Sequence, residues 1–79
     1  MWRYAGRLPC PTSLAVSLGE GLTPLVPAAR IGAMVGVNGL LIKDEGRNPT
    51  WSYKDRFTSV AVSMAKAQGA RVVATASSG

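Results

Sequence analysis

Nine residues decide how this chain folds: Asn48-Pro49-Thr50-Trp51-Ser52-Tyr53-Lys54-Asp55-Arg56. Pro49 disfavours helical geometry at Asn48, so a helix can begin only after the proline. Ser52 is a favoured N-cap residue, and Asp55 three positions later completes the pattern of a capping box. This spacing predicts a helix that starts at Ser52 and carries Lys54 in its first turn.

Lys54 is expected at the end of the helix where a positive charge is least favourable. The helix dipole is positive at the N-terminus, and lysines are usually placed near the other end. A lysine in the first turn is therefore either a solvated surface residue or one whose amine is needed uncharged. Residue type and position alone leave both interpretations open.

The helix is predicted to span residues 52–68, because apolar side chains recur on one face at spacings of three and four. That face consists of Phe57, Val60, Ala61, Met64 and Ala65. Ser59, Ser63 and Lys66 occupy much of the remaining surface, and Gly69 is a natural residue to follow a helix. Residues 70–76 are rich in small and β-branched side chains and are predicted to form a strand.

A preceding strand is predicted at about residues 39–43, where a short apolar run is bounded by turn residues. Strand 39–43, helix 52–68 and strand 70–76 then make one βαβ unit of an α/β fold with a parallel sheet and a right-handed crossover. Ligands bind at the carboxyl ends of the strands in such sheets. Lys54 follows the first strand and Ser77-Ser78-Gly79 follows the second, so both are expected at one edge of the sheet.

The loop at residues 44–49 begins with two carboxylates, Asp44 and Glu45. Adjacent side chains on an extended chain point in opposite directions, so a shared acid–base role is not expected. We predict that these carboxylates are solvated, or that one of them forms an ion pair with Lys43 or Arg47.

Residues 1–24 are predicted to form an irregular arm, because prolines and glycines interrupt them too often for long elements. Leu14, Val16 and Leu18 alternate within this arm in the pattern of a short strand. Pro27 suits the first position of a short helix over residues 28–35, which Gly36 or the turn residues 38–39 would end.

Length and composition describe a small globular chain. Its 79 residues allow one small domain or part of one, and 47% hydrophobic with 16% charged residues is not a disordered composition. The net charge of +5 is scattered along the chain, which argues against nucleic-acid binding. No apolar run has the length of a membrane span, so no membrane partner is expected.

Cys10 is the single cysteine, so no internal disulfide can form and a reducing compartment is expected. The chain has no histidine, which argues against a zinc site and against an activated Cys10 nucleophile. No continuous apolar segment of the signal-peptide kind occurs near the start. The expected location is cytoplasmic.

The stretch 48–56 resembles the lysine motif of fold-type II pyridoxal-phosphate enzymes, and that of threonine synthase-like members in particular. The family pattern reads Asn-Pro-Thr-Gly-Ser-Phe-Lys-Asp-Arg-Gly, from which this chain departs at Trp51, Tyr53 and Phe57. Three further segments resemble family motifs in the same order: Ser17-Leu18-Gly19-Glu20-Gly21-Leu22-Thr23-Pro24-Leu25, Lys43-Asp44-Glu45-Gly46 and Ala76-Ser77-Ser78-Gly79. Together the four motifs cover most of the chain.

The resemblance implies that Lys54 is the catalytic residue and holds pyridoxal phosphate as a Schiff base. It implies that Tyr53 packs against the cofactor ring, and that Ser77, Ser78 and Gly79 bind the carboxylate of a small amino-acid substrate. A homodimer is implied for the longer protein. Trp51, which replaces a glycine near the lysine, is expected to narrow the substrate pocket, change specificity or mark a subfamily.

The implied reaction is that of a lyase in amino-acid biosynthesis, which converts O-phosphohomoserine and water into threonine and phosphate. Residues 1–79 would then be an incomplete N-terminal portion, with the arm at 1–24 and the start of the α/β cofactor domain at 25–79. The glycine-rich phosphate loop of the family lies beyond them, so the chain alone is expected to be inactive. Two alternatives stay open: a related enzyme such as cysteate synthase or an amino-acid ammonia-lyase, and a non-catalytic truncated product or interaction fragment.

Overall fold

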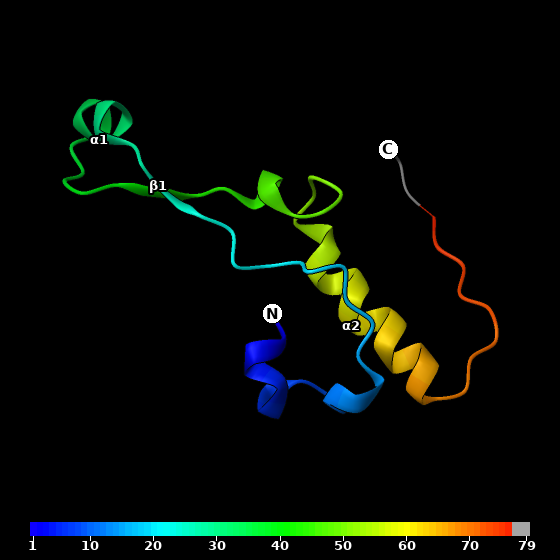
Figure 1. Cartoon of the computed structure of the whole chain (residues 1–79). Helices are drawn as coiled ribbons and strands as arrows, with labels where there is room; N and C mark the ends of the chain where they lie inside the picture. Colours follow the sequence, from blue (N-terminus) through cyan, green and yellow to red (C-terminus); the bar gives the residue numbers. More distant parts are fainter. Residues whose placement is uncertain (77–79) are drawn as a thin grey trace.

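The computed structural model describes residues 1–76, and helix α2, Lys54–Ala67, is its longest element. Two short 3-10 helices precede it in the arm, η1 (Trp2–Arg7) and η2 (Thr12–Leu14), and η2 packs against α2 (Figure 1). A third, η3 (Glu45–Arg47), lies just before the turn into α2. The predicted helix at 52–68 is therefore present, and it begins two residues later than the sequence pattern indicated.

Two short strands form an antiparallel ribbon that extends away from α2 (Figure 1). Strand β1 is Leu25–Pro27 and strand β2 is Leu41–Lys43, with Val26 opposite Ile42. Backbone hydrogen bonds continue the ladder at both ends, from the amide of Ala28 to the carbonyl of Leu40 and from the amide of Asp44 to the carbonyl of Pro24. The predicted strand at 39–43 is thus confirmed in its last three residues.

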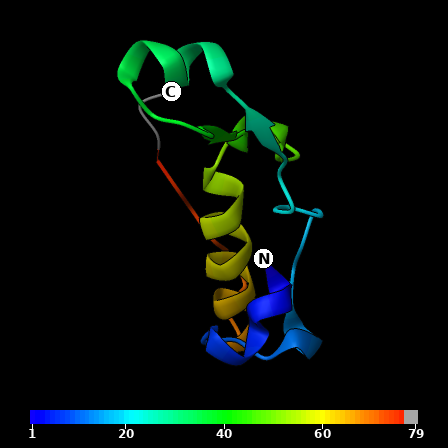
Figure 2. The same ribbon diagram turned by 90° about the vertical axis from the view of Figure 1, so that its left-hand side faces the viewer.

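Helix α1, Ala29–Val35, connects the two strands and lies at the far tip of the ribbon (Figure 2). Its end is set by Gly36, which adopts a left-handed conformation with φ of 71°. Glycine accepts this conformation without the steric cost that a Cβ atom brings. The short helix predicted over residues 28–35 is confirmed, although Pro27 belongs to β1 rather than to the helix.

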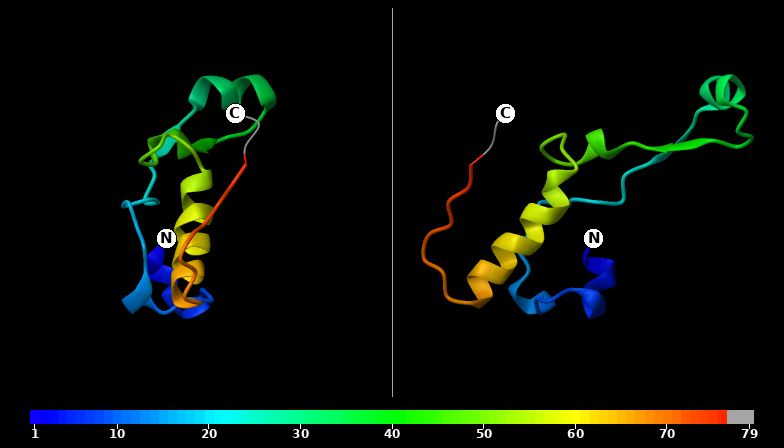
Figure 3. Two further views of the ribbon diagram at one scale, coloured as in Figure 1. Left: turned by 90° about the vertical axis from the view of Figure 1, so that its right-hand side faces the viewer. Right: turned by 180° about the vertical axis from the view of Figure 1, so that it is seen from behind.

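The parallel βαβ unit is not seen within the described residues, so the strand predicted at 70–76 is not confirmed and stays a prediction. Residues 70–76 are exposed, form no ladder and run clear of the other elements (Figure 3). Strand β2 pairs with β1 instead. Antiparallel pairing needs only a local partner, whereas parallel sheets occur almost only where helices cover both faces. The two α-helices described here cannot supply that cover.

Helix α2 buries a different face from the one that its apolar pattern predicted. Its buried residues are Ser59 and Ser63, whereas Phe57 is 75% exposed. The serines face the arm because backbone groups of the arm need hydrogen-bond partners, and small side chains allow that close approach. The other members of the apolar stripe, Val60, Ala61, Met64 and Ala65, are half-buried.

The arm is held by hydrogen bonds rather than by strand pairing, so the short strand predicted around Leu14, Val16 and Leu18 is absent. The amide of Val16 donates to the Ser63 hydroxyl, and its carbonyl accepts from the Ser59 hydroxyl. The indole N–H of Trp2 also donates to Ser59, at 3.0 Å. Cys10 is buried with a free thiol and is the only buried hydrophobic residue among residues 1–76. Within residues 1–76, no helix has both the length and the apolar character needed to span a membrane.

Candidate functional site

A tight turn at residues 48–51 precedes helix α2. The amide of Trp51 donates to the carbonyl of Asn48 at 2.8 Å, and the Asp55 carboxylate accepts from both the amide and the hydroxyl of Thr50. The Ser52 hydroxyl accepts from the amide of Lys54 at 3.2 Å. The predicted capping box is therefore wrong, because Tyr53 rather than Ser52 is the N-cap residue and Asp55 bonds to Thr50 instead of the Ser52 backbone.

Three large side chains are exposed to solvent at this end of α2. Lys54 is exposed as the first residue of the helix, Tyr53 is 67% exposed and Trp51 is 85% exposed. Trp51 also has a φ of 58°, a left-handed conformation that bulky residues rarely adopt. The amine of Lys54 is thus accessible, and an aromatic residue immediately precedes it.

A partly buried polar cluster lies behind this exposed end, with Thr23 and Asn48 buried and the Glu45 and Arg56 side chains each 27% exposed. The guanidinium of Arg56 donates to both oxygens of the Glu45 carboxylate, from Nε to Oε2 at 2.6 Å and from Nη2 to Oε1 at 2.8 Å. The Thr23 hydroxyl donates to Oε1 at 2.5 Å and accepts from Arg56 Nη2 at 3.1 Å. These contacts, with those from Arg56 the largest cause, hold the pKa of Glu45 well below its ordinary value.

Asn48 joins the same cluster to the glycine-rich segment upstream. Its side chain is 1% exposed and donates to the backbone carbonyl and to Oε2 of Glu45, at 2.8 and 3.1 Å. Its Oδ1 accepts from the amide of Gly21 at 3.0 Å. Gly21 has a φ of 93°, and a Cβ atom there would lie 3.0 Å from Arg56 Nη1. Glycine at this position therefore allows the close approach of Arg56.

The acidic pair of the loop does not act as one unit. Asp44 forms an exposed ion pair with Arg47 at 3.8 Å, one of the alternatives left open by the sequence, whereas Glu45 pairs with Arg56. Sequence reasoning missed the second pair, because the two residues are separated by a turn. The available signal was that Arg56 is one of two arginines within about ten residues of Glu45.

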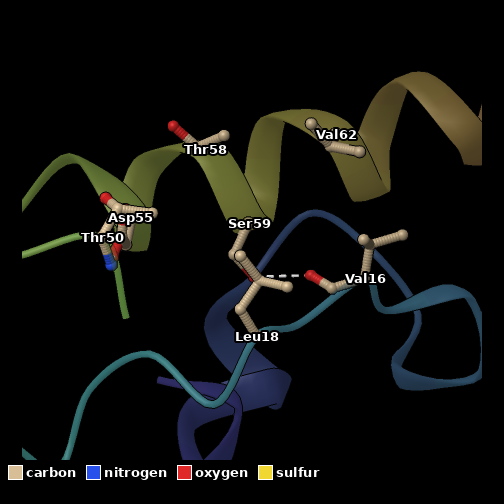
Figure 4. A pocket seen from close by; sticks show the side chains of 7 residues that line it. All are labelled: Val16, Leu18, Thr50, Asp55, Thr58, Ser59 and Val62. Atoms are coloured by element: carbon tan, nitrogen blue, oxygen red, sulfur yellow. Dashed lines mark hydrogen bonds between the residues drawn. The ribbon is translucent and has the colours of Figure 1, made fainter. Parts of the chain in front are cut away.

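A mainly apolar cavity of about 210 Å³ separates the arm from the first turns of α2. Figure 4 shows Val16 and Leu18 of the arm across from helix residues that include Thr58 and Val62. Asp55 and Thr50 line the same cavity, but Lys54 does not. No sequence pattern indicates this cavity, because it depends on how the arm lies against the helix.

The structure describes two of the five predicted site residues. Lys54 and Tyr53 lie together at the exposed start of α2. Ser77, Ser78 and Gly79 fall outside the described residues, so their expected place beside Lys54 stays a prediction. Among residues 1–76, no group of three or more acidic or cysteine side chains is arranged to hold a metal ion.

Comparison with known proteins identifies the family. The sequence profile described as pyridoxal-phosphate dependent enzyme matches residues 16–79, which include the turn, Lys54 and the polar cluster. The chain belongs to this family of pyridoxal-phosphate dependent enzymes. No solved structure gives a significant match.

Several threonine synthases are similar to this chain. The chain is 42% identical over its whole length to the threonine synthase of Methanosarcina acetivorans, of which it covers 19%. It is 44% identical to that of Methanocaldococcus jannaschii, again over its whole length and 20% of the relative. For the enzyme of a Bacillus species, identity is 45% over 98% of this chain and 22% of the relative. The chain therefore spans about a fifth of the length of these relatives.

The described residues meet one of two requirements for binding pyridoxal phosphate. The cofactor needs a lysine amine, and Lys54 offers an exposed one at the start of α2. Its phosphate also needs a cradle of free amides, but the first-turn amides of Lys54, Asp55 and Arg56 are bonded to Ser52 and Tyr53. The described residues thus offer the cofactor an exposed lysine amine, whereas these three amides at the start of α2 are not free to bind its phosphate.

Proposed function

We propose that these 79 residues are the N-terminal portion of a threonine synthase-like enzyme. Its reaction would convert O-phosphohomoserine and water into threonine and phosphate. The observation that carries the proposal is the exposed Lys54 amine at the start of α2, inside a segment that is related along its whole length to threonine synthases. The amino-acid substrate would be small, and the longer protein would be a cytoplasmic homodimer.

Pyridoxal phosphate, when bound, supplies an electron sink for the carbon atoms next to an amino group. In this proposal Lys54 holds the cofactor through its amine and moves protons during the reaction. Tyr53 packs on the cofactor ring, and Ser77, Ser78 and Gly79 bind the substrate carboxylate. Trp51, exposed three residues before Lys54, forms a wall of the substrate pocket.

The proposal also includes the parallel βαβ unit. In the longer protein, residues 70–76 become a parallel strand beside β2, which completes the βαβ unit. The exposure of Val72 and Val73, at 83% and 57%, supports this, because a strand of a covered sheet would bury such side chains. The apolar side of α2, with Phe57 at 75% exposure, would be covered in the same way.

The chain alone is proposed to be inactive, because the bonded amides of Lys54, Asp55 and Arg56 leave the phosphate of the cofactor no cradle at the start of α2. Assaying the purified 79-residue chain with O-phosphohomoserine and pyridoxal phosphate should give no threonine above the buffer control. Turnover at an enzymatic rate would contradict this part of the proposal. In the longer protein, threonine should form, and cysteate synthase or ammonia-lyase substrates should not react.

The attachment point can be tested without any turnover. The chain contains three lysines, Lys43, Lys54 and Lys66. After incubation with pyridoxal phosphate and reduction by borohydride, mass spectrometry should find the label mainly at Lys54. Lys54→Arg should remove it and Lys66→Arg should not. Equal labelling of Lys54 and Lys66 would contradict a special role for Lys54.

A second candidate, a non-catalytic interaction fragment, is favoured by exposed apolar side chains such as Met34 at 86% and Leu25 at 59%. A ribbon of only two strands also leaves an edge of each strand open for association. Sedimentation of the purified chain separates the candidates. Defined self-association without lysine labelling would favour the interaction fragment.

A further inference from the structure

The Glu45 carboxylate is saturated with hydrogen-bond donors. Oε1 accepts from Thr23 and from Arg56 Nη2, and Oε2 accepts from Arg56 Nε and from Asn48. Charge-assisted, bidentate contacts of this kind are stronger and geometrically stricter than ordinary hydrogen bonds. The carboxylate therefore allows Arg56 very little freedom.

The donors come from three separate segments of the chain. Thr23 precedes β1, Asn48 ends the loop after β2, and Arg56 belongs to the first turn of α2. Thr23 and Asn48 are 6% and 1% exposed and the Glu45 and Arg56 side chains are each 27% exposed, so water has limited access to these contacts. The nearby Asp44–Arg47 pair differs in every respect, with one contact at 3.8 Å and side chains 42% and 72% exposed.

Because Arg56 and Lys54 belong to the same helical turn, fixing the side of the helix that Arg56 occupies also fixes the direction of Lys54. Successive residues of an α-helix are rotated by about 100°, so residues two apart point in nearly opposite directions. Arg56 lies two positions after Lys54 and is held on the side of the polar cluster. Lys54 must then point away from that cluster, which agrees with its exposure.

We propose that Glu45, Arg56, Thr23 and Asn48 form a clamp that sets the direction in which Lys54 leaves the helix. The clamp residues are positioning residues and do not touch the cofactor. This inference rests on the proposed function, because it concerns the presentation of the Lys54 amine to pyridoxal phosphate.

The test measures the ratio of label at Lys54 to label at Lys66 after reduction with borohydride. Lys66 lies in the last turn of the same helix and is exposed, so it reports general lysine reactivity. Glu45→Gln and Arg56→Lys should each lower the ratio about fivefold, the loss expected for a strong hydrogen-bonded pair. The double variant should be no worse than either single one, because both remove the same interaction.

Arg47→Lys is the matched control, since it makes the same exchange in the exposed ion pair of the same loop. It should leave the ratio unchanged. Thr23→Val removes a single donor and should lower the ratio by less, in a chain whose helix content by circular dichroism equals that of the wild type. This variant keeps the test valid where a charged variant loses its helix.

The outcomes separate the clamp from the proposed function. A wild-type preference for Lys54 that survives Glu45→Gln, Arg56→Lys and Thr23→Val overturns the clamp and leaves the function standing. A wild-type chain without that preference contradicts the cofactor role of Lys54 itself. A ratio that falls equally in Arg47→Lys also overturns the clamp, because a general charge effect then explains the data.

Discussion

The hydroxyl of Ser63 accepts a hydrogen bond of 2.8 Å from the backbone amide of Val16, 47 residues earlier in the chain. The same hydroxyl donates to the carbonyl of Ser59 at 2.6 Å, and Ser63 is completely buried. One polar side chain of α2 thus ties the N-terminal arm to the helix.

Ser63→Ala should therefore destabilise the chain. The substitution leaves the amide of Val16 without its partner, which costs about 1–3 kcal/mol for a buried group. Thermal unfolding followed by circular dichroism should show a lower midpoint. Ser13→Ala is the control, because Ser13 is exposed in η2. Equal midpoints for the two variants would show that the arm is not held by Ser63.

Trp51→Gly should stabilise the chain, although it removes a large side chain. Trp51 adopts a φ of 58° and is 85% exposed, so its indole gains little from packing. Relief of a left-handed conformation gains about 1–2 kcal/mol, and the added freedom of glycine in the unfolded chain costs about 0.5–1 kcal/mol. The free energy of unfolding in urea should rise by the difference.

Tyr53→Gly is the matched control for that prediction. Tyr53 is also an exposed aromatic residue, but its φ of −61° and ψ of −20° are helical. Glycine there should lower the free energy of unfolding by about 0.5–1 kcal/mol. Opposite signs for the two variants are expected, and a loss of stability in both would rule out strain at Trp51.

The Arg56–Glu45 pair should make stability depend on pH in the acid range. Because the pKa of Glu45 is lowered in the folded chain, the unfolded chain takes up a proton first as the pH falls. The contribution is fully present above the ordinary value of 4.5 and is lost progressively as the pH falls toward the lower folded value. Glu45→Gln should therefore flatten the dependence of the urea midpoint on pH below about 4.5. An unchanged slope in that variant would contradict the assignment.

Gly32→Ala should loosen helix α1 despite the better helix propensity of alanine. A Cβ atom at Gly32 would lie 2.5 Å from the carbonyl oxygen of Val37 and 3.3 Å from Cβ of Leu40. Such overpacking costs about 1–3 kcal/mol, more than the gain in propensity of about 1 kcal/mol. Hydrogen exchange of the amides at residues 29–35 should become faster. Gly6→Ala, where no atom lies within 4 Å, should leave it unchanged.

Local structure was largely predictable from the sequence. The position of α2, the short helix α1 ended by Gly36 and the strand at 41–43 all follow from caps, glycines and apolar runs that act within a few residues. The Asp44–Arg47 pair was predictable for the same reason, since its members are three positions apart.

Long-range choices were not predictable in the same way. The apolar stripe of α2 indicated a buried Phe57, yet the buried residues are serines, whose hydroxyls bond the backbone of Val16 in the arm. The pattern at 70–76 indicated a strand, but a strand requires a partner, and β2 pairs with β1. Glu45 similarly pairs with Arg56 across a turn.

The sequence by itself determined the local elements and, through the motif around Lys54, the family to which the chain belongs. Only the tertiary structure decided which face of α2 is buried, which arginine Glu45 binds and which strand pairs with β2. The physical reason is that caps and turns depend on neighbouring residues. Side-chain burial and strand pairing depend instead on which polar groups, distant in the sequence, come together and satisfy one another's hydrogen bonds.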